Sequence, residues 1–318
     1  MRCLVTGAAG FLGSHVVSQL LQSGSEVTVL LRQASDLRRI HDLLPQTQII
    51  VGDLLRVADV KNQIIDSRPE VIFHLAWTGG SSGRHQNDPA QFETNLPGSL
   101  NLLQIASDAG VRRWIGIGTA FEYGNLPDTL TELLLPKPNT LYAISKYSLC
   151  LATAKMCALH GIEYIWARPF AIYGTEDDPR GLIPFVAKSL LRGQRPALTA
   201  GAQCWDYTYV EDAARALVQL AITPNAQGIY NLASGTAQTV RTLVERIRDM
   251  INPDLPLGFG EIPYHPDQIM NLKADITKLQ QLTGWSAQVP LDDGLRSVIE
   301  ESRRQAYGGY PQLTDTKK

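Results

Sequence analysis

Residues 1–17 read MRCLVTGAAGFLGSHVV, a short apolar run followed by glycines at Gly7, Gly10 and Gly13. An apolar run that passes directly into an amphipathic segment at 14–22 is typical of a strand that feeds a helix. The first glycine permits a sharp turn, the second lets backbone approach a bound group, and the third lets helix and sheet lie close together. The helix N-terminus would direct its free N–H groups at that bound group. The stretch therefore predicts a pyrophosphate-binding turn, the alternative being a tight turn with incidental glycines.

The rest of the chain alternates short runs rich in Val and Ile with longer segments of helical period. Runs that are apolar on both faces are typical of parallel strands covered by helices. We expect an α/β fold, a doubly wound parallel sheet of the Rossmann type with a smaller C-terminal substrate lobe. Strands are expected at 2–6, 26–31, 48–51, 71–75, 113–117 and 163–167. Helices are expected at 14–22, 90–109, 139–160, 211–222, 239–251 and 291–305.

The alternation loosens after about residue 170, where prolines and glycines become frequent. We expect residues 1–170 to form the dinucleotide-binding domain, with strands and helices of about 205–235 returning to it. Residues 171–310 are expected to form mainly the substrate-binding lobe, and residues 311–318 a frayed tail.

The composition and charge limit which partners and which cellular compartment we expect for the protein. A formal net charge of −2 with scattered basic residues argues against nucleic acid. No apolar stretch approaches the roughly 20 residues of a membrane span, and no targeting segment precedes the first strand, so we expect a cytoplasmic protein without a membrane partner. Ligand-spaced histidines are lacking near the cysteines, so we expect no metal. Reduced core thiols are expected at Cys3, Cys150, Cys157 and Cys204.

A second motif, LYAISKYS at 141–148, places Tyr142 and Lys146 four residues apart on one face of an expected helix. A neighbouring ammonium stabilises a phenolate, so the Tyr142 pKa is expected to fall from about 10 toward the working range of a general acid or base. Thr119 ends the fifth expected strand, at the edge where open α/β sheets bind ligands. The three side chains predict a proton-transfer site, whereas an exposed helix face would explain the Tyr–Lys pair alone.

The stretch TGAAGFLG resembles the N-terminal fingerprint of the extended short-chain dehydrogenase/reductase superfamily, which includes the NAD-dependent epimerase/dehydratase family, and the resemblance covers nearly the whole chain. It implies that Thr119 hydrogen-bonds the substrate oxygen, Tyr142 exchanges the proton and Lys146 holds the nicotinamide ribose. It also implies a homodimer formed through the helices at 90–109 and 139–160. The expected cofactor-binding residues are Gly7, Gly10, Phe11, Leu12, Gly13, Arg32, Asp53, Leu54, Leu75, Ala76, Tyr142, Lys146 and Arg168.

The end of the second strand bears on the choice of dinucleotide. An acidic residue there would bind the ribose hydroxyls of NAD, but the sequence has Leu31, Arg32 and Gln33. The guanidinium of Arg32 favours NADP(H) over NAD(H) because it can bind a 2′-phosphate. Asp36 could still supply the acid, and Arg32 could be a solvated surface residue. Asp53 resembles an adenine contact, with a capping aspartate as the alternative.

Departures from the family pattern bear on the substrate. Ala171 and Trp205 stand where nucleotide-sugar enzymes usually have asparagine and arginine, and His265 replaces a second arginine. WDY and IPYHPDQ resemble the 4-ketoreductase branch that includes CDP-abequose synthases. Dehydratases would have Asp and Glu after the threonine, where this chain has Ala120 and Phe121. Trp205 could stack on the substrate or pack under the helix that follows it.

We expect NADPH-dependent reduction of a nucleotide-linked 4-keto-6-deoxy sugar, with the tyrosine as general acid. The alternative is an NAD(P)-dependent nucleotide-sugar 4-epimerase, and a more distant one is a non-catalytic NADP-binding regulator. Other arginines are considered as ligands of the substrate diphosphate, because Trp205 stands where the family usually has an arginine. The expected substrate residues are Trp77, Arg84, Thr119, Ala120, Arg180, Trp205 and His265.

Overall fold

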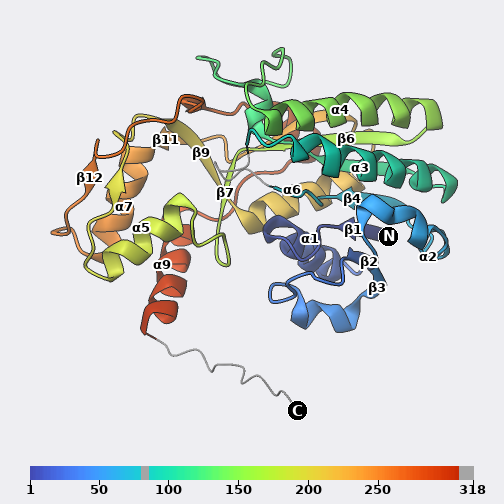
Figure 1. Cartoon of the computed structure of the whole chain (residues 1–318), viewed down its shortest axis with the longest axis horizontal. Coiled ribbons are helices and arrows are strands. Elements are labelled where there is room, and N and C mark those ends of the chain that lie inside the picture. Colours follow the sequence, from blue (N-terminus) through green and yellow to red (C-terminus); the bar gives the residue numbers. More distant parts are fainter. Residues whose placement is uncertain (80–85, 308–318) are drawn as a thin grey trace.

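The larger lobe is built on a seven-stranded sheet in which every neighbouring pair is parallel. A computed structural model of the chain describes residues 1–79 and 86–307 (Figure 1). In their order across the sheet the strands are β10 (Gly228–Leu232), β6 (Glu163–Pro169), β5 (Arg113–Ile117), β4 (Val71–His74), β1 (Arg2–Thr6), β2 (Glu26–Leu31) and β3 (Gln48–Val51).

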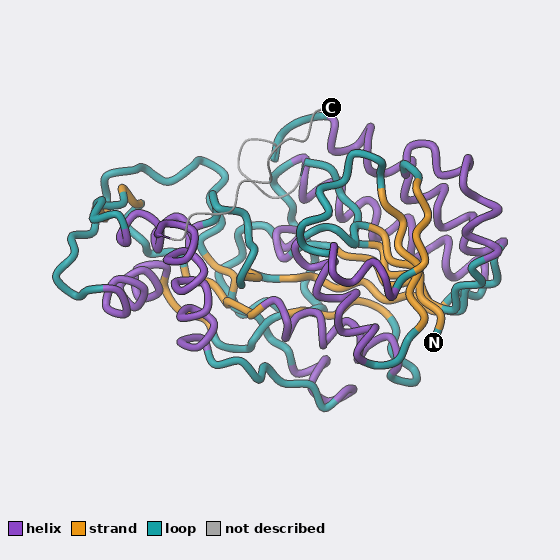
Figure 2. Tube along the Cα trace, turned by 90° about the horizontal axis from the view of Figure 1, so that it is seen from below, coloured by secondary structure: helices purple, strands orange, loops and turns teal. Residues whose placement is uncertain are grey.

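Helices cover both faces of this sheet, as Figure 2 shows. Residues of one strand alternate between the two faces, so Cys3 and Val5 join one apolar cluster and Leu4 joins the other. The first cluster includes α1 (Phe11–Gln22) and α6 (Val210–Ile222), and the second includes α2 (Lys61–Asp66), α3 (Ala90–Asp108) and α4 (Leu141–His160). The expected doubly wound fold is confirmed.

The order of the strands reverses between β1 and β4, so the chain leaves β1 toward one edge of the sheet and returns to continue toward the other. In open α/β sheets this switch point opens a crevice at the carboxyl ends of the strands. Short 3₁₀ helices follow two of the strands directly: η2 (Leu54–Val60) comes after β3 and η3 (Ala120–Tyr123) after β5. A third, η1 (His41–Gln46), lies just before β3.

The smaller lobe has a sheet in which β9 (Cys204–Tyr209) pairs with β7 (Ala171–Tyr173), β11 (Ala237–Thr239) and β13 (Asn271–Leu272). A third apolar cluster joins this sheet to α5 (Leu182–Leu191), α7 (Val240–Ile251) and α9 (Leu291–Tyr307), drawn together in Figure 1. The remaining elements are β8 (Ala197–Leu198), β12 (Gly258–Phe259) and α8 (Thr277–Thr283).

The segment 205–235 divides between the two lobes. Its helix α6 packs against α1 and its strand β10 pairs with β6, so both belong to the larger lobe. Strand β9 instead forms the centre of the smaller sheet, which differs from the expected return of the whole segment. The expected tail at 311–318 lies outside the described residues.

Within residues 1–79 and 86–307, no helix is both long and apolar enough to span a membrane, and no group of three or more His, Cys, Asp or Glu side chains could hold a metal ion. The four cysteines are free thiols, with Cys3, Cys150 and Cys157 buried and Cys204 partly exposed.

Candidate active site

The glycine turn between β1 and α1 has a backbone that side chains would not fit. Gly7 has a φ of 70°, and a Cβ on it would lie 2.6 Å from the Ala76 backbone nitrogen. A Cβ on Gly13 would collide with the Gly7 carbonyl oxygen. Gly10 is the N-cap of α1, no side chain caps the helix there, and its first turn has no acidic residue. The first N–H groups of α1 are therefore suited to an anion.

A cavity of about 510 Å³ opens from this turn along the carboxyl ends of β1, β2 and β4. Its volume lies in the range of small-molecule and cofactor sites. The glycine cradle and the uncapped helix end fit the pyrophosphate of a dinucleotide. The expected cofactor or substrate residues that line the cavity are Gly7, Gly10, Arg32, Asp53, Leu54, Leu75, Ala76 and Trp77. Phe11, Leu12 and Gly13 lie behind it in the first turn of α1.

Arg32, Ser35 and Asp36 line the end of the cavity that follows β2. The Asp36 carboxylate accepts hydrogen bonds from Arg38, with Nη2 at 2.6 Å and Nε at 2.9 Å. The Arg38 contacts hold the Asp36 pKa low, at about 2. Asp36 is therefore an ionised group whose charge is largely compensated by Arg38, beside a freely exposed Arg32.

Asp53 caps η2 and also lines the cavity. Its Oδ1 accepts a hydrogen bond of 2.9 Å from the Leu55 backbone nitrogen. The capping bond fixes the loop that forms this wall of the cavity.

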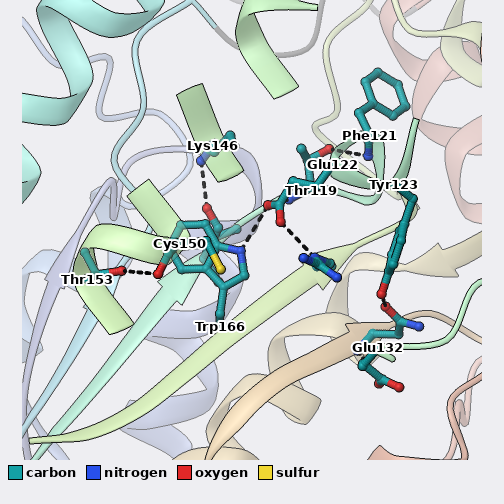
Figure 3. Close-up of polar contacts among 12 residues, drawn as sticks. Thr119, Phe121, Glu122, Tyr123, Glu132, Lys146, Cys150, Thr153 and Trp166 are labelled. Carbon is teal, nitrogen blue, oxygen red and sulfur yellow. Dashed lines mark hydrogen bonds and ion pairs between the residues drawn. The ribbon is translucent and has the colours of Figure 1, made fainter. Parts of the chain in front are cut away.

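Thr119, Tyr142 and Lys146 come together where β5 ends against α4. All three side chains are at least nine-tenths buried. Thr119 is the N-cap of η3, and its hydroxyl accepts a hydrogen bond of 3.2 Å from the Phe121 backbone nitrogen. The same side chain lies near enough to the Tyr142 phenol to lower its pKa. Lys146 Nζ donates a hydrogen bond of 2.7 Å to the Ile117 carbonyl, a contact drawn in Figure 3. The sheet and one face of α4 thus bring the three sequence-predicted side chains into one cluster.

The expected lowering of the Tyr142 pKa is wrong for this geometry. Burial raises the Tyr142 pKa to about 12, and the neighbouring Thr119 side chain opposes that rise only in part. Burial also lowers the Lys146 pKa to about 7, against a smaller opposing effect of Glu122. The reason is desolvation, which disfavours both charged forms and which residue spacing on a helix does not reveal.

Glu122 supports the Thr–Tyr–Lys cluster through buried hydrogen bonds, and Figure 3 shows its carboxylate between two of its hydrogen-bond partners. Fully buried, it accepts hydrogen bonds from the Thr119 backbone nitrogen at 3.0 Å, Trp166 Nε1 at 3.0 Å and Arg168 Nε at 2.8 Å. Burial raises the Glu122 pKa, and Arg168 is the main opposing influence. A Cβ on Gly118 would collide with Glu122 and Trp166. The network fixes the backbone that carries the Thr119 hydroxyl.

Arg168 is placed differently from its expected cofactor contact. Its side chain is 1% exposed, pairs with Glu122 and lies with its guanidinium carbon 4.5 Å from the Tyr123 ring centroid. It is not among the residues lining the cavity. The sequence pattern T-x-x-E at 119–122 is that of a capping box and could have indicated the local part of this network.

His74 and Asn95 are hydrogen-bonded inside the protein. His74 Nδ1 and Nε2 each lie 2.8 Å from a hydroxyl, those of Thr6 and Ser99, and burial lowers the His74 pKa to about 3. Asn95 Oδ1 accepts a hydrogen bond of 2.7 Å from the Thr78 backbone nitrogen, so Asn95 ties α3 to the loop after β4. Both residues shape the site as uncharged groups.

The expected substrate residues are only partly brought together. Trp205 lies 6.5 Å from the Phe121 ring, centroid to centroid, and its Nε1 donates a hydrogen bond of 3.0 Å to the Ile269 carbonyl. Ala120 is buried in the core. Arg180 and His265 are exposed beside Asp178 and Asp267, respectively. Arg84 lies outside the described residues.

A doubly wound sheet with a glycine-turn cavity beside a Thr–Tyr–Lys cluster defines an oxidoreductase-type enzyme of the extended short-chain dehydrogenase/reductase class. The chain belongs to the NAD dependent epimerase/dehydratase family, whose model matches residues 3–233. It is 27% identical to a UDP-glucose 4-epimerase of Mycolicibacterium smegmatis over 96% of this chain and all of that one. It is 30% identical to UDP-glucuronic acid decarboxylase 6 of Arabidopsis thaliana, over 95% and 89% of the two chains.

Solved structures agree with this assignment. The UDP-glucose 4-epimerase of Thermus thermophilus in complex with NAD superposes with a TM-score of 0.85 at 28% identity, covering 95% of this chain and 99% of that one. The dTDP-glucose 4,6-dehydratase DesIV of Streptomyces venezuelae, also with NAD, gives a TM-score of 0.87 at 28% identity, over 97% and 99% of the two chains.

Proposed function

We propose that the protein reduces the 4-keto group of a nucleotide-linked 4-keto-6-deoxy sugar with NADPH. The observation that carries this proposal is the meeting of Thr119, Tyr142 and Lys146 beside the dinucleotide cavity, with apolar residues where a dehydratase would need acid and base. Ala120 is buried and apolar, and Phe121 presents its ring edge-on toward the Tyr142 ring at 6.4 Å, centroid to centroid. Neither side chain can move a proton during water loss.

The chain's residues supply the proton and the orientation for this reduction. When bound, reduced nicotinamide supplies the hydride that carbon 4 of the sugar accepts. The Tyr142 hydroxyl then donates its proton to the alkoxide oxygen that forms at carbon 4, while the Thr119 hydroxyl hydrogen-bonds the same oxygen. A Tyr142 pKa of about 12 keeps the phenol protonated at neutral pH, which is the form that a general acid needs.

One feature supports one-way reduction over epimerisation. An epimerase must present both faces of the keto sugar in turn. Aromatic rings crowd this position: Trp77 at 6.3 Å and Phe121 at 6.4 Å from the Tyr142 ring. Such crowding restricts rotation of a bound sugar.

Epimerisation at carbon 4 remains the second candidate because curated and solved relatives include UDP-glucose 4-epimerases. The two reactions differ in their cofactor balance. A reductase consumes NADPH in a one-to-one ratio with the sugar, whereas an epimerase regenerates its dinucleotide and produces no net change. Stopped-flow measurement of reduced nicotinamide with a 4-keto-6-deoxy nucleotide sugar therefore separates the two.

We propose NADP(H) as the preferred dinucleotide. Arg32 is exposed on the cavity wall and can bind a 2′-phosphate, while the nearby Asp36 charge is compensated by Arg38. The solved relatives described above contain NAD, which makes this preference a point on which the chain is proposed to differ from them.

On the substrate side, we propose that Trp205 packs at the junction of the two lobes and presents part of its ring to the sugar nucleotide. Its ring contacts the apolar clusters of both lobes and faces Phe121. Thermal stabilisation measured with a panel of nucleoside diphosphates would identify the nucleotide. We also propose a homodimer formed through α3 and α4.

A further inference from the structure

Trp77 lies between the dinucleotide cavity and the proton-transfer cluster. It lines the cavity between Ala76 and Thr78. Lys146 Nζ lies 3.8 Å from the centroid of its ring, and the Tyr142 ring meets it at 87° with 6.3 Å between centroids. One indole therefore touches both residues of the Tyr–Lys pair from the side of the cavity.

The position of the indole is fixed from α3. Trp77 Nε1 donates a hydrogen bond of 2.8 Å to Gln91 Oε1, and Gln91 Nε2 donates one of 2.6 Å to the Gly79 carbonyl. Gln91 is 2% exposed, so its amide is held within the protein. The far edge of the indole is thus anchored, and its face is left to the Lys146 ammonium.

The titratable groups around Lys146 are neutral or are bound by other partners. The Trp77 indole is therefore the nearest surface that compensates the charge of the Lys146 ammonium. Within α4 the titratable neighbours are Tyr142 and Cys150, whose pKa values burial raises to about 12, so both are neutral. From β4, His74 is neutral because burial lowers its pKa to about 3.

The facing 3₁₀ helix η3 contributes Glu122, whose charge favours the ammonium form of Lys146 but whose carboxylate is bound by Thr119, Trp166 and the charged Arg168. From α3, Gln91 and Asn95 are uncharged. The remaining contact of Lys146 is the Ile117 carbonyl at 2.7 Å. A buried ammonium with one neutral acceptor gains most from an adjacent aromatic face.

We propose that Trp77 is a positioning residue of the reaction site: its indole face binds the Lys146 ammonium through a cation–π contact and keeps that side chain charged beside the dinucleotide cavity. The role of this contact in turnover rests on the proposed function, while the contact itself does not. A cation–π contact favours the charged form of lysine, so it opposes the burial that lowers the Lys146 pKa.

The pH dependence of kcat tests the role in turnover. Replacing Trp77→Leu removes the aromatic face, and we expect the pH limb that reports Lys146 to move about one unit lower. We expect kcat to fall about 10-fold while the KM for the sugar changes less than about 2-fold. Trp77→Phe keeps a smaller aromatic face and should restore part of both changes. Trp285→Phe changes a buried tryptophan that is hydrogen-bonded to the Asp212 carbonyl, has no contact with Lys146, and should leave the pH limb in place. An unshifted limb in Trp77→Leu would overturn the inference.

Tryptophan emission tests the contact without any substrate. Protonation of an ammonium over an indole changes its emission, so the wild-type protein should show a pH transition that is lost in both Lys146→Met and Trp77→Phe. A transition that persists in Lys146→Met contradicts the contact. If the transition is present but no keto sugar is reduced, the proposed function fails and the contact stands. If sugars are reduced but neither the transition nor the pH limb depends on Trp77, the inference fails and the proposed function stands.

Discussion

The Tyr142 hydroxyl is the residue on which the proposed chemistry depends. Burial raises its pKa to about 12, against a smaller opposing influence of the neighbouring Thr119, so at neutral pH it carries a proton. General acids of this kind contribute about 10²- to 10⁴-fold to rate.

Tyr142→Phe should therefore lower kcat by at least about 100-fold. It should leave the dissociation constant for the dinucleotide within about 2-fold, because the pyrophosphate turn and the cavity after β2 are untouched. Steady-state kinetics and dinucleotide titration measure the two quantities. Full turnover in this variant would contradict the role given to Tyr142, whereas a wild-type protein that binds the dinucleotide without any turnover would point to the non-catalytic regulator considered from the sequence.

The buried pair of Glu122 and Arg168 predicts a large loss of stability on mutation. Arg168→Met leaves the Glu122 carboxylate buried without its cation, and breaking such a pair costs about 3–5 kcal/mol of the free energy of unfolding. Arg180→Met is the matched control, since its pair with Asp178 is exposed and should contribute nothing measurable. Urea unfolding curves compare the two. Equal stability of both variants would contradict the structural role given to Arg168.

The preference for NADP(H) rests on Arg32. Arg32→Ala should raise the dissociation constant of NADPH by about 10-fold or more and leave that of NADH within about 2-fold, because only NADPH carries the 2′-phosphate. Arg112→Ala is the matched control, because Arg112 is an exposed arginine just before β5, at the end of the strands opposite the cavity. Equal weakening of both dinucleotides, or tighter binding of NADH by the wild type, would contradict the preference.

At the scale of the elements, the β1–α1 turn allows the cost of a left-handed backbone to be measured separately from the cost of a steric clash. Gly7 and Gly110 have nearly the same φ, 70° and 71°, but a Cβ on Gly110 meets nothing within 4 Å. Gly110→Ala should cost only the left-handed backbone penalty, about 1–2 kcal/mol. Gly7→Ala should cost more and abolish dinucleotide binding, since its Cβ meets the Ala76 nitrogen at 2.6 Å. Thermal unfolding and dinucleotide titration measure this, and equal effects at both positions would refute the close-approach argument.

At this scale the sequence predicted six strands of the large sheet, because each is a short apolar run. Five of them are buried on both faces, whereas Ile49 and Val51 of the edge strand β3 are exposed. From the sequence, strands of about 205–235 were expected to return to this sheet, but without bounds for β10, whose GIYNL lacks such an apolar run. The sequence missed the short strands β11 and β13, which tertiary pairing with β9 determines. The Tyr–Lys pair was predictable because its members lie one helical turn apart. The Glu122–Arg168 pair was not, because its partners are 46 residues apart and meet only through strand register.

For the whole molecule, the proposed homodimer places the outer faces of α3 and α4 at an interface. Ile144 and Leu151, seven residues apart on α4, are 37% and 56% exposed, which is unusual for large apolar side chains on one helix face. Leu151→Glu should convert the dimer into monomers in light scattering, whereas Leu133→Glu, a loop residue 96% exposed, should not. A wild-type protein that is monomeric at micromolar concentration would contradict the proposal.

The central claim is that Tyr142 protonates an oxygen at carbon 4 while reduced nicotinamide is consumed. The most direct measurement is the loss of nicotinamide absorbance in a single mixing experiment with excess nucleotide-linked 4-keto-6-deoxy sugar. We predict that each equivalent of NADPH is oxidised once in the wild-type protein, and that this oxidation is at least about 100-fold slower in Tyr142→Phe. An unchanged absorbance in the wild type, or an equal rate in the variant, would contradict the account.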